Sequence, residues 1–336
     1  MPISMINLAC PVCGNEKCNE TIKTNEMMFG SNDEFIYQEC SLCGTLTLLN
    51  VPPDMSKYYP QDYYSFTKVK GYNPLVDFLR RKRMESLLLN ASLFGTALQK
   101  ILPVPNHHLW IRNVDIGYDS RILDVGCGSG YFLHILRLEG FRSLVGIDPY
   151  IAETTKKDGI CLIKGEICDL DKQRFDIVLF NHSLEHMLEP ANSLSDAGTI
   201  LAEGGHCIVA TPVSDSYAYK KYGRHWVGLD SPRHLQVFSR KGMKACAIGA
   251  GFIIKSIIEV SKADQFWASE QYVNGIPLFS ESSYAVNQSK SMFSRNDIKR
   301  YKRMSKVLNL QRLGDQAIFI MCRSIADPVS LDTDLG

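Results

Sequence analysis

Residues 121–140 constrain the fold of this chain more than any other segment. They read Arg-Ile-Leu-Asp-Val-Gly-Cys-Gly-Ser-Gly-Tyr-Phe-Leu-His-Ile-Leu-Arg-Leu-Glu-Gly, an apolar strand, a glycine turn and then a helix with apolar residues at helical spacing. Glycines let the chain turn sharply and bring backbone N–H groups and a helix N-terminus against a polar ligand. A second apolar strand, residues 144–147, ends at Asp148, whose carboxylate can accept both ribose hydroxyl hydrogens. The two signals predict an α/β fold with a nucleotide-type ligand site.

The spacing of the glycines distinguishes between ligands. A dinucleotide site has G-x-G-x-x-G, whereas Gly126, Gly128 and Gly130 form G-x-G-x-G. Asp124 stands in the strand just before this turn. The motifs D-V-G-C-G-S-G and G-I-D-P resemble the first two motifs of class I S-adenosylmethionine-dependent methyltransferases. The resemblance implies that S-adenosylmethionine is the cofactor, with its methionine end at Asp124 and the glycine turn and its ribose on Asp148.

A third motif of that family concerns the adenine ring. Residues 165–170, Gly-Glu-Ile-Cys-Asp-Leu, resemble it. The resemblance implies that Glu166 contacts the adenine amine and that the backbone N–H of Ile167 meets the ring. Asp169 is the alternative acid, and the sequence leaves both open.

The remaining apolar segments follow the strand order of the same family. Residues 175–180 are almost wholly apolar, as in the middle of a parallel sheet. Residues 201–210 resemble the family's L-x-P-G-G turn and its fifth strand. Residues 251–259 and 317–322 would be the last two strands, antiparallel at the sheet edge. The resemblance implies a Rossmann-like, seven-stranded methyltransferase sheet with helices on both faces.

Two cysteine pairs mark a separate N-terminal module. Cys10-Pro-Val-Cys13-Gly and Cys40-Ser-Leu-Cys43-Gly are separated by 26 residues. Two such turns can place four thiolates around one tetrahedral zinc ion, and four protein sulfurs leave no open coordination position. The segment 34–39 alternates like a strand, with a hairpin partner at 45–49. We therefore expect an N-terminal zinc ribbon whose zinc is structural rather than catalytic.

An aromatic segment and a helical segment follow the ribbon. Residues 58–66 hold five aromatic rings, and Tyr63 and Tyr64 are candidate substrate contacts in a lid; the alternative is that the rings dock the ribbon onto the next domain. Residues 73–102 predict one or two amphipathic helices that cover the catalytic domain with their charges solvated. The expected division is a ribbon over 1–50, this hinge and its helices over 51–118, the methyltransferase domain over 119–325 with an acceptor-site insertion at 212–242, and a tail over 326–336.

Chemistry is expected from the segments after the fourth and fifth strands, because ligands of open α/β sheets bind beyond the carboxyl ends of the strands. Methyl transfer to a hydroxyl or an acidic C–H needs a base, and histidine titrates near neutrality. The candidates are His182, His186, His225 and His234. We favour His186 and His234; alternatively, His186 only caps a helix and His234 packs a loop.

The same segments hold candidate substrate contacts and a candidate metal site. Arg224 and Arg233 suit a phosphate-bearing acceptor, or else form surface ion pairs. Tyr222 and Trp226 are the aromatic candidates. The pattern H-x-x-E-H at positions 182, 185 and 186 offers three potential metal ligands on one turn, as an alternative to a base.

Three short motifs narrow the resemblance: E-H at residues 185–186, T-P at 211–212 after the fifth strand, and W-x-G-L-D-x-P-R-H-L at 226–235. Together they resemble a group of zinc-ribbon methyltransferases related to sugar methyltransferases, often linked to surface polysaccharide or secondary metabolite synthesis. The resemblance implies methylation of a small molecule, a sugar or nucleotide-linked sugar. The alternatives are an RNA methyltransferase with a zinc ribbon and a non-catalytic, cofactor-binding interaction protein.

Composition limits the partners. Lys plus Arg total 37 against 36 for Asp plus Glu, a net charge of +1, and an N-P-P-Y-like base-binding tetrapeptide is absent after the fourth strand. Nucleic acid is therefore disfavoured as a partner. No apolar stretch approaches the ~20 residues of a membrane span, and residues 1–10 lack the features of a signal peptide. The sequence predicts a cytoplasmic protein with reduced cysteines.

Overall fold

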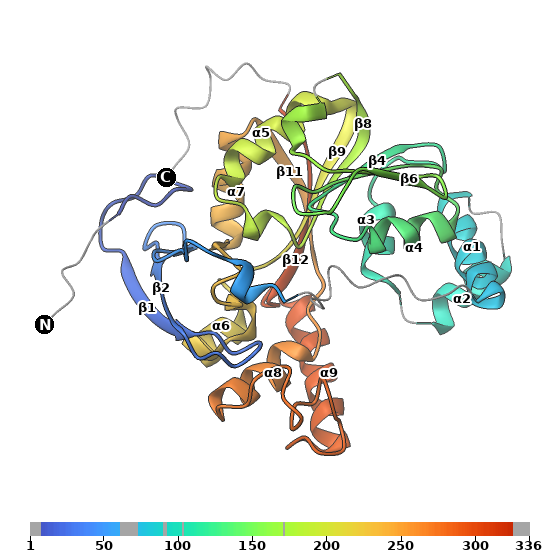
Figure 1. Cartoon of the computed structure of the whole chain (residues 1–336). Helices are drawn as coiled ribbons and strands as arrows, with labels where there is room; N and C mark the ends of the chain where they lie inside the picture. The colour runs from blue at the N-terminus through green and yellow to red at the C-terminus, as the bar shows by residue number, and fades with distance from the viewer. Residues whose placement is uncertain (1–7, 61–72, 90–92, 103, 171, 325–336) are drawn as a thin grey trace, which may run out of the picture.

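Two β-sheets organise the chain in the computed structural model, which describes residues 8–60, 73–89, 93–102, 104–170 and 172–324 (Figure 1). The larger sheet has eight strands in the order β11-β12-β9-β8-β4-β5-β7-β6, and the smaller has four in the order β1-β2-β3-β10. Among the described helices, none has the length and hydropathy that a bilayer crossing requires.

The large sheet is mostly parallel. Its parallel pairs join β4 (Arg121–Val125), β5 (Ser143–Ile147), β7 (Ile160–Ile163), β8 (Phe175–Asn181) and β9 (Leu201–Pro212). At one edge, β12 (Gln316–Arg323) runs antiparallel to both β9 and β11 (Phe252–Glu259). This arrangement confirms the Rossmann-like methyltransferase fold that the sequence predicts.

The expected count of seven strands is not what the structure has. The eighth strand, β6 (Thr155–Lys157), pairs antiparallel with β7 at the other edge. Asp158 and Gly159 form the two-residue connection, with φ angles of 52° and 80°. A two-residue Asp-Gly loop with positive φ at both positions is the preferred hairpin turn, and this local signal produces the extra strand.

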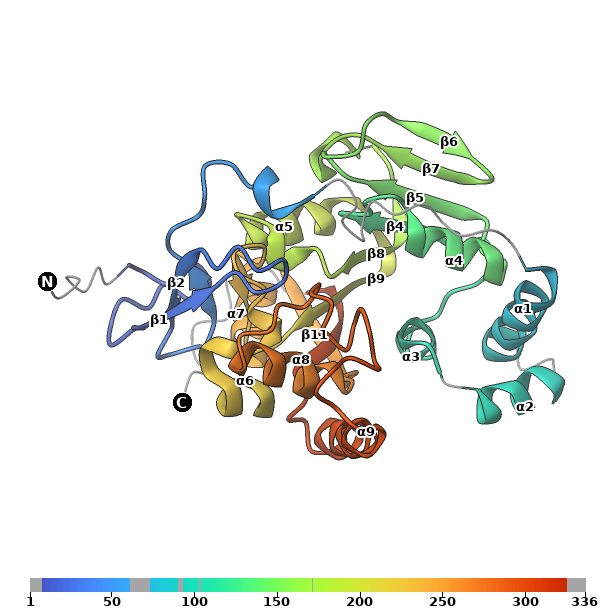
Figure 2. The ribbon, with the colours of Figure 1, turned by 60° about the horizontal axis from the view of Figure 1, so that its bottom comes forward.

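Helices cover both faces of the large sheet (Figures 1 and 2). Alternate residues of β8 point to opposite faces, so Ile177 and Leu179 belong to a different core from Val178 and Phe180. The first core includes residues of α1 (Pro74–Leu89), α3 (Asn106–Ile111) and α4 (Tyr131–Glu139). The second includes residues of α5 (Pro190–Ile200) and α7 (Arg240–Gly249).

The segment 73–102 forms two helices, α1 and α2 (Leu93–Ile101), but their burial differs from the expectation. Leu75 and Phe78 on α1 are 67% and 50% exposed. Arg83, expected in solvent, is buried, and Met84 is the α1 residue in the core of the catalytic domain. Contact with that domain therefore runs through the face of α1 that carries Arg83 and Met84.

The small sheet joins the N-terminal module to the catalytic domain. As predicted, β2 (Glu34–Glu39) pairs antiparallel with β3 (Leu46–Leu48), and β1 (Glu20–Asn25) adds a strand on the other side of β2. The fourth strand, β10 (Gln236–Val237), comes from the acceptor-side segment and pairs with β3. The module is therefore built into the catalytic domain, and η1 (Ser56–Tyr58) lies on the chain that leaves it.

Further helices extend from the carboxyl edge of the large sheet. The register sets Gln316, the first residue of β12, opposite Pro212, the last residue of β9. The segment between β11 and β12 therefore emerges at this edge and forms α8 (Asp264–Val273) and α9 (Arg295–Leu310). Shorter helices at the same edge are α6 (Tyr217–Tyr222), η3 (Ile167–Leu170), η4 (Leu184–His186), η5 (Gly223–His225) and η6 (Val227–Leu229).

Candidate active site

The glycine turn between β4 and α4 has the shape of a ligand cradle. Gly126, Gly128 and Gly130 have φ angles of 73°, 51° and 73°, in the left-handed region that favours glycine. A Cβ on Gly126 would lie 2.6 Å from the Cβ of Ser183, so the turn packs directly against the segment that follows β8. This contact places the residues after β8 beside the turn.

Two carboxyl groups accompany the turn. Asp148 accepts the N–H of Gly128 at 2.9 Å with one oxygen and the N–H of Tyr150 at 2.8 Å with the other. A carboxylate oxygen has a second lone pair, so both oxygens can still accept ribose hydroxyl hydrogens. Burial, reinforced by the charge of Asp148, raises the pKa of Asp124 to about 8. These groups fit a nucleoside-containing ligand such as S-adenosylmethionine.

At the expected adenine motif, the two acids differ in their surroundings. One carboxylate oxygen of Asp169 accepts the backbone N–H of Glu166 at 2.9 Å, which closes the first turn of η3. The side chain of Glu166 is exposed, and Ile167 is buried. The carboxylate of Asp169 therefore stabilises the local turn at Glu166. The roles of Glu166 and Ile167 at the adenine ring stay predictions.

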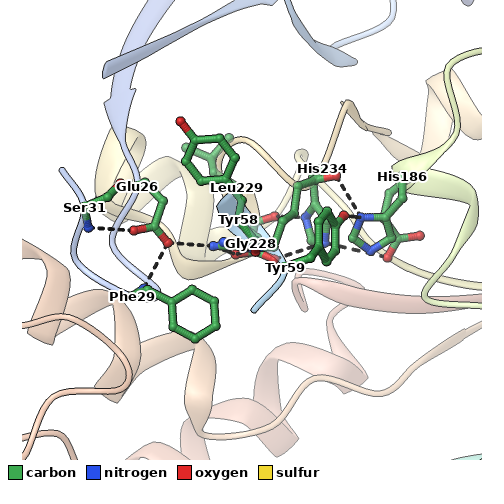
Figure 3. A network of polar contacts seen from close by, with 12 residues as sticks. Glu26, Phe29, Ser31, Tyr58, Tyr59, His186, Gly228, Leu229 and His234 are labelled. Carbon is green, nitrogen blue, oxygen red and sulfur yellow. Dashed lines mark hydrogen bonds and ion pairs between the residues drawn. The ribbon is translucent and has the colours of Figure 1, made fainter. Parts of the chain in front are cut away.

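His186 and His234 lie side by side beyond β8, with ring centroids 4.8 Å apart (Figure 3). Nδ1 of His186 lies 2.7 Å from the carbonyl oxygen of Arg233, and Nδ1 of His234 lies 2.9 Å from that of Gly228. A carbonyl oxygen only accepts, so each Nδ1 carries the proton and donates. The neutral form of each ring then has its lone pair on Nε2. Burial lowers the pKa of His186, with a further contribution from His234, so this imidazole is neutral at pH 7.

Glu185 is a buried carboxylate beside these rings. Among the described residues, neither of its oxygens has a hydrogen-bond partner. One oxygen of Glu185 lies within ion-pair distance of Nδ1 of His182, at 3.4 Å, and of Nε2 of His234, at 4.0 Å. Burial acts to raise the pKa of Glu185, but the surrounding histidines outweigh it and lower that pKa. The cluster therefore presents an ionised carboxylate to imidazoles that can take up a proton.

The same cluster could hold a divalent metal ion. One ligand atom each of Glu185, His186 and His234 lies within 4.8 Å of the others. The set differs from the predicted His182, Glu185 and His186, because the side chain of His182 is 45% exposed while His234 comes in from the next segment.

Arg233 is buried rather than facing an acceptor. Its Nη2 donates to Asp230 at 2.7 Å and to Glu26 at 3.0 Å, and its Nη1 donates to the carbonyl oxygen of Tyr58 at 3.2 Å (Figure 3 shows Glu26 and Tyr58). The guanidinium thus uses its donors inside the protein. Sequence reasoning missed Glu26, which has no local signal because it lies 207 residues away from Arg233.

Two aromatic candidates are also internal anchors. Nε1 of Trp226 donates to Asp315 at 3.1 Å, and the hydroxyl of Tyr222 donates to Glu270 at 2.7 Å. Trp226 is 1% exposed. Because their polar groups are satisfied within the fold, these side chains support the walls of the site instead of presenting a surface to an acceptor.

The other predicted residues lie apart from the histidine pair. Nε of Arg224 lies 3.1 Å from Nε2 of His225, and both residues line a cavity of about 230 Å³ with Asn25 and Tyr272. His225 is therefore not in the cluster of Glu185, His186 and His234. Tyr63 and Tyr64 lie outside the described residues.

Tyr59 is a further residue that the sequence did not assign. Its hydroxyl lies 3.2 Å from Nδ1 of His186, while the neighbouring Tyr58 packs edge-on against Phe35 of β2. The aromatic segment thus begins with one ring docked on the ribbon, as one of the two alternatives predicts, and the next ring at the histidine pair.

The four predicted cysteine ligands come together. Sγ of Cys10 lies 3.7 Å from Sγ of Cys43, and Sγ of Cys13 lies 3.5 Å from Sγ of Cys40. All four sulfurs lie within 4.8 Å of one another. A tetrahedral ion with bonds of about 2.3 Å separates its sulfur ligands by about 3.8 Å, so the cluster fits zinc.

Comparison with known proteins identifies the family. The model of a methyltransferase domain family matches residues 89–257, half of the chain. The chain belongs to this methyltransferase family. It is an S-adenosylmethionine-dependent methyltransferase, as the sequence predicts.

Individual relatives are more distant. The chain is 29% identical to a tRNA U34 carboxymethyltransferase of Dichelobacter nodosus over 35% of this chain and 42% of the relative. It is 26% identical to a ubiquinone biosynthesis O-methyltransferase of Photobacterium profundum, over 30% of this chain and 48% of the relative. The chain thus spans less than half the length of these relatives. A solved methyltransferase of Thermotoga maritima, described as a possible histamine N-methyltransferase, superimposes with a TM-score of 0.39 at 16% identity, over 74% of this chain and 92% of that one.

These relatives correct one prediction. The net charge of +1 was expected to disfavour nucleic acid as a partner, yet several relatives are tRNA U34 carboxymethyltransferases, from Dichelobacter nodosus and Psychromonas ingrahamii among others. Net charge sums the whole chain and does not report how charge is distributed over the surface. The prediction that nucleic acid is an unlikely partner is therefore wrong.

Proposed function

We propose that this methyltransferase methylates RNA. We further propose that one of the two histidines beyond β8, His186 or His234, is the general base. The observation that carries the proposed site is the arrangement of His186 and His234, each of which donates from Nδ1 to a carbonyl and leaves Nε2 to accept a proton. Ser183 ties this segment to the cofactor turn, because its hydroxyl donates to the carbonyl oxygen of Val125 at 2.6 Å.

The reaction needs alignment and a base. When bound at the glycine turn and Asp148, S-adenosylmethionine would supply a methyl group on a sulfonium, and in-line displacement by the acceptor would break the methyl–sulfur bond as the acceptor–methyl bond formed. Nε2 of His186 or His234 takes the acceptor's proton. The ionised Glu185 stabilises the imidazolium that results, because its buried carboxylate oxygen lies 4.0 Å from Nε2 of His234.

RNA is proposed as the acceptor because several relatives act on tRNA by name. A second candidate is a small molecule. The relatives that are ubiquinone biosynthesis O-methyltransferases favour it, as does the sequence resemblance to sugar methyltransferases. The cavity of about 230 Å³ beside Arg224 has the size and charge for a phosphate-bearing group.

We also propose that the cysteine cluster holds one structural zinc ion. Burial raises the pKa of Cys13 to about 11, and the hydrogen bond with Cys10 raises the pKa of Cys43 to about 12. Thiolates packed this closely repel one another unless a cation lies between them. All eleven cysteines lie within the described residues and none of them forms a disulfide there, which supports the proposed cytoplasmic location.

The acceptor is tested with S-adenosylmethionine that carries a tritiated methyl group. The wild-type protein is incubated with total RNA or with a mixture of nucleotide sugars and small metabolites. We expect ribonuclease-sensitive label, and its loss in His186→Asn but not in His206→Asn, a histidine in β9 away from the carboxyl edge. Label only in small molecules would replace RNA by the second candidate. Label in neither pool, from protein that binds the cofactor, would contradict both.

A further inference from the structure

One helix of this protein, α9, carries a local excess of positive charge. The chain as a whole has a net charge of +1, but α9 alone carries six basic residues and one acidic residue. The basic residues are Arg295, Lys299, Arg300, Lys302, Arg303 and Lys306, and all six are exposed. Within the described residues, only Arg300 of these has an ion-pair partner, Asp297 at 3.3 Å. The positive charge of α9 is therefore not neutralised locally.

Helical periodicity gathers these charges on one side. Arg295, Lys299, Lys302, Arg303 and Lys306 follow the spacing i, i+4, i+7, i+8 and i+11 of a single helix face. The opposite side carries the buried residues Ile298, Tyr301 and Leu308, which belong to the same hydrophobic core as Trp226 and Leu229. We call the five-residue basic side the α9 stripe. It spans eleven steps of about 1.5 Å, or about 16 Å.

The α9 stripe is anchored to the acceptor-side segment. Just after the helix, the carbonyl oxygen of Leu313 accepts the backbone N–H of Tyr217 at 3.0 Å. Asp315 holds Nε1 of Trp226. Both partners belong to the segment that also supplies His234. In both views α9 lies on the outside of the molecule, with α8 next to it (Figures 1 and 2). A long ligand on α9 would thus have its end held near the carboxyl edge of the large sheet.

We propose that the α9 stripe binds the phosphate backbone of the RNA acceptor. Five exposed cations along about 16 Å of helix suit a polyanion with regularly repeated charges, whereas a single small anion would engage only one or two of them. Phosphate contacts position a nucleic acid without reading its sequence. The stripe therefore sets where the RNA lies, and the histidine pair acts on the nucleotide that reaches it. This inference rests on the proposed RNA acceptor.

Binding is measured by fluorescence anisotropy with unfractionated, end-labelled tRNA as the probe, at several salt concentrations. The test variant is the triple substitution Lys299→Glu, Arg303→Glu and Lys306→Glu. The control is Lys156→Glu with Lys157→Glu on β6, which reverses two exposed charges instead of three and lies at an edge strand of the large sheet, away from α9. Melting temperatures and S-adenosylhomocysteine affinity establish that both variants are folded and that their cofactor sites are intact.

We expect the wild-type protein and the control to bind tRNA equally, and the triple variant to bind about tenfold or more weakly. Each lost phosphate contact removes about 0.7–0.9 from the slope of log affinity against log salt, so that slope should fall by about 2–3 in the triple variant. Equal weakening in the control variant would overturn the assignment to α9. So would binding of wild-type protein to vesicles of anionic phospholipid, but not to tRNA, with the same dependence on the stripe.

The methyl-transfer assay separates this inference from the proposed function. If wild-type protein and the triple variant bind and methylate RNA equally well, the α9 inference fails while the RNA acceptor stands. If the wild-type protein neither binds tRNA nor methylates RNA, the proposed acceptor fails, and the α9 inference fails with it.

Discussion

Replacing Glu26 by glutamine tests whether the N-terminal module shapes the active site. Glu26 is buried in the loop after β1, and its carboxylate accepts hydrogen bonds from the N–H groups of Phe29 at 2.9 Å and Ser31 at 3.0 Å. The same carboxylate is 3.0 Å from Nη2 of Arg233, whose carbonyl oxygen receives the Nδ1–H of His186. One carboxylate thus links the ribbon to the proposed base.

The expected loss in the free energy of unfolding depends on which partners Arg233 keeps in Glu26→Gln. Removing one partner of a buried ion pair costs about 3–5 kcal/mol when the other charge is left alone. Asp230 stays within 2.7 Å of Arg233, so the guanidinium is still paired. Glutamine keeps one oxygen and loses the charge, and a hydrogen bond to a charged group contributes about 1.5–3 kcal/mol. We therefore expect Glu26→Gln to lower the free energy of unfolding by about 2–3 kcal/mol.

The assay compares Glu26→Gln with Glu34→Gln. Glu34 lies on β2 and pairs with Lys23 at 2.8 Å, but both side chains are about half exposed, so this pair contributes at most about 1 kcal/mol. Denaturant unfolding gives the free energies, and turnover per folded molecule gives the effect on His186. We expect Glu26→Gln to lose both stability and turnover while cofactor affinity is kept. Equal stability of the two variants, or full turnover in Glu26→Gln, would refute the reasoning.

Three further predictions concern the cofactor, the metal and the base. Asp148→Ala should weaken S-adenosylmethionine binding by about 1.5–3 kcal/mol in calorimetry, and tight NAD binding by the wild type would contradict the proposed role of Asp148. Metal analysis should find about one zinc per chain. Cys40→Ser should lose both the zinc and turnover but keep its cofactor affinity, because β3 pairs with the strand that follows His234. A Cys40→Ser protein that is folded and zinc-bound but inactive would contradict a structural role of the zinc. Replacement of His186 or His234 by Asn should cut turnover about 10²–10⁴-fold if that residue is the base. Because the pKa of His186 is lowered, its neutral form persists at acid pH, so the acid limb of kcat/KM should lie below pH 6.5 if His186 is the base. Near-normal turnover in a variant that lacks both His186 and His234 would contradict the assignment of either residue as the base.

Local patterns predicted the cofactor half of the molecule. The glycine turn and Asp148 are separated by one helix and one strand, so their meeting follows from the right-handed crossover of a βαβ unit. Each cysteine pair also forms a single local turn, closed by the N–H of Gly14 on Cys10 and by that of Gly44 on Cys40. The two turns meet across 27 and 33 residues, and the repeated C-x-x-C-G motif is the signal that predicted this meeting.

Long-range pairing could not be predicted in the same way. The pairing of β3 with β10 joins residues near 46 to residues near 237, and Glu26 meets Arg233 across a similar distance. Neither contact has a periodic or spaced signature. Arg233 was therefore interpreted as a phosphate contact or as part of a surface ion pair, whereas the structure buries it in ion pairs with two carboxylates. A buried arginine is stable only when partners are present, and the sequence did not reveal them.

The contacts around His234 indicate how the N-terminal ribbon supports the proposed active site. The hydroxyl of the buried Tyr37, on β2, donates to the carbonyl oxygen of His234 at 2.6 Å. Two residues later the chain enters β10 and pairs with β3. The backbone of His234 is thus held from the ribbon by a side chain and by a strand, and Glu26 holds the preceding residue, Arg233. If the cysteine cluster holds zinc as proposed, loss of that ion would release β2 and β3 together. Its first effect on catalysis would then be on the position of the histidine pair and not on the cofactor turn, which packs against Ser183.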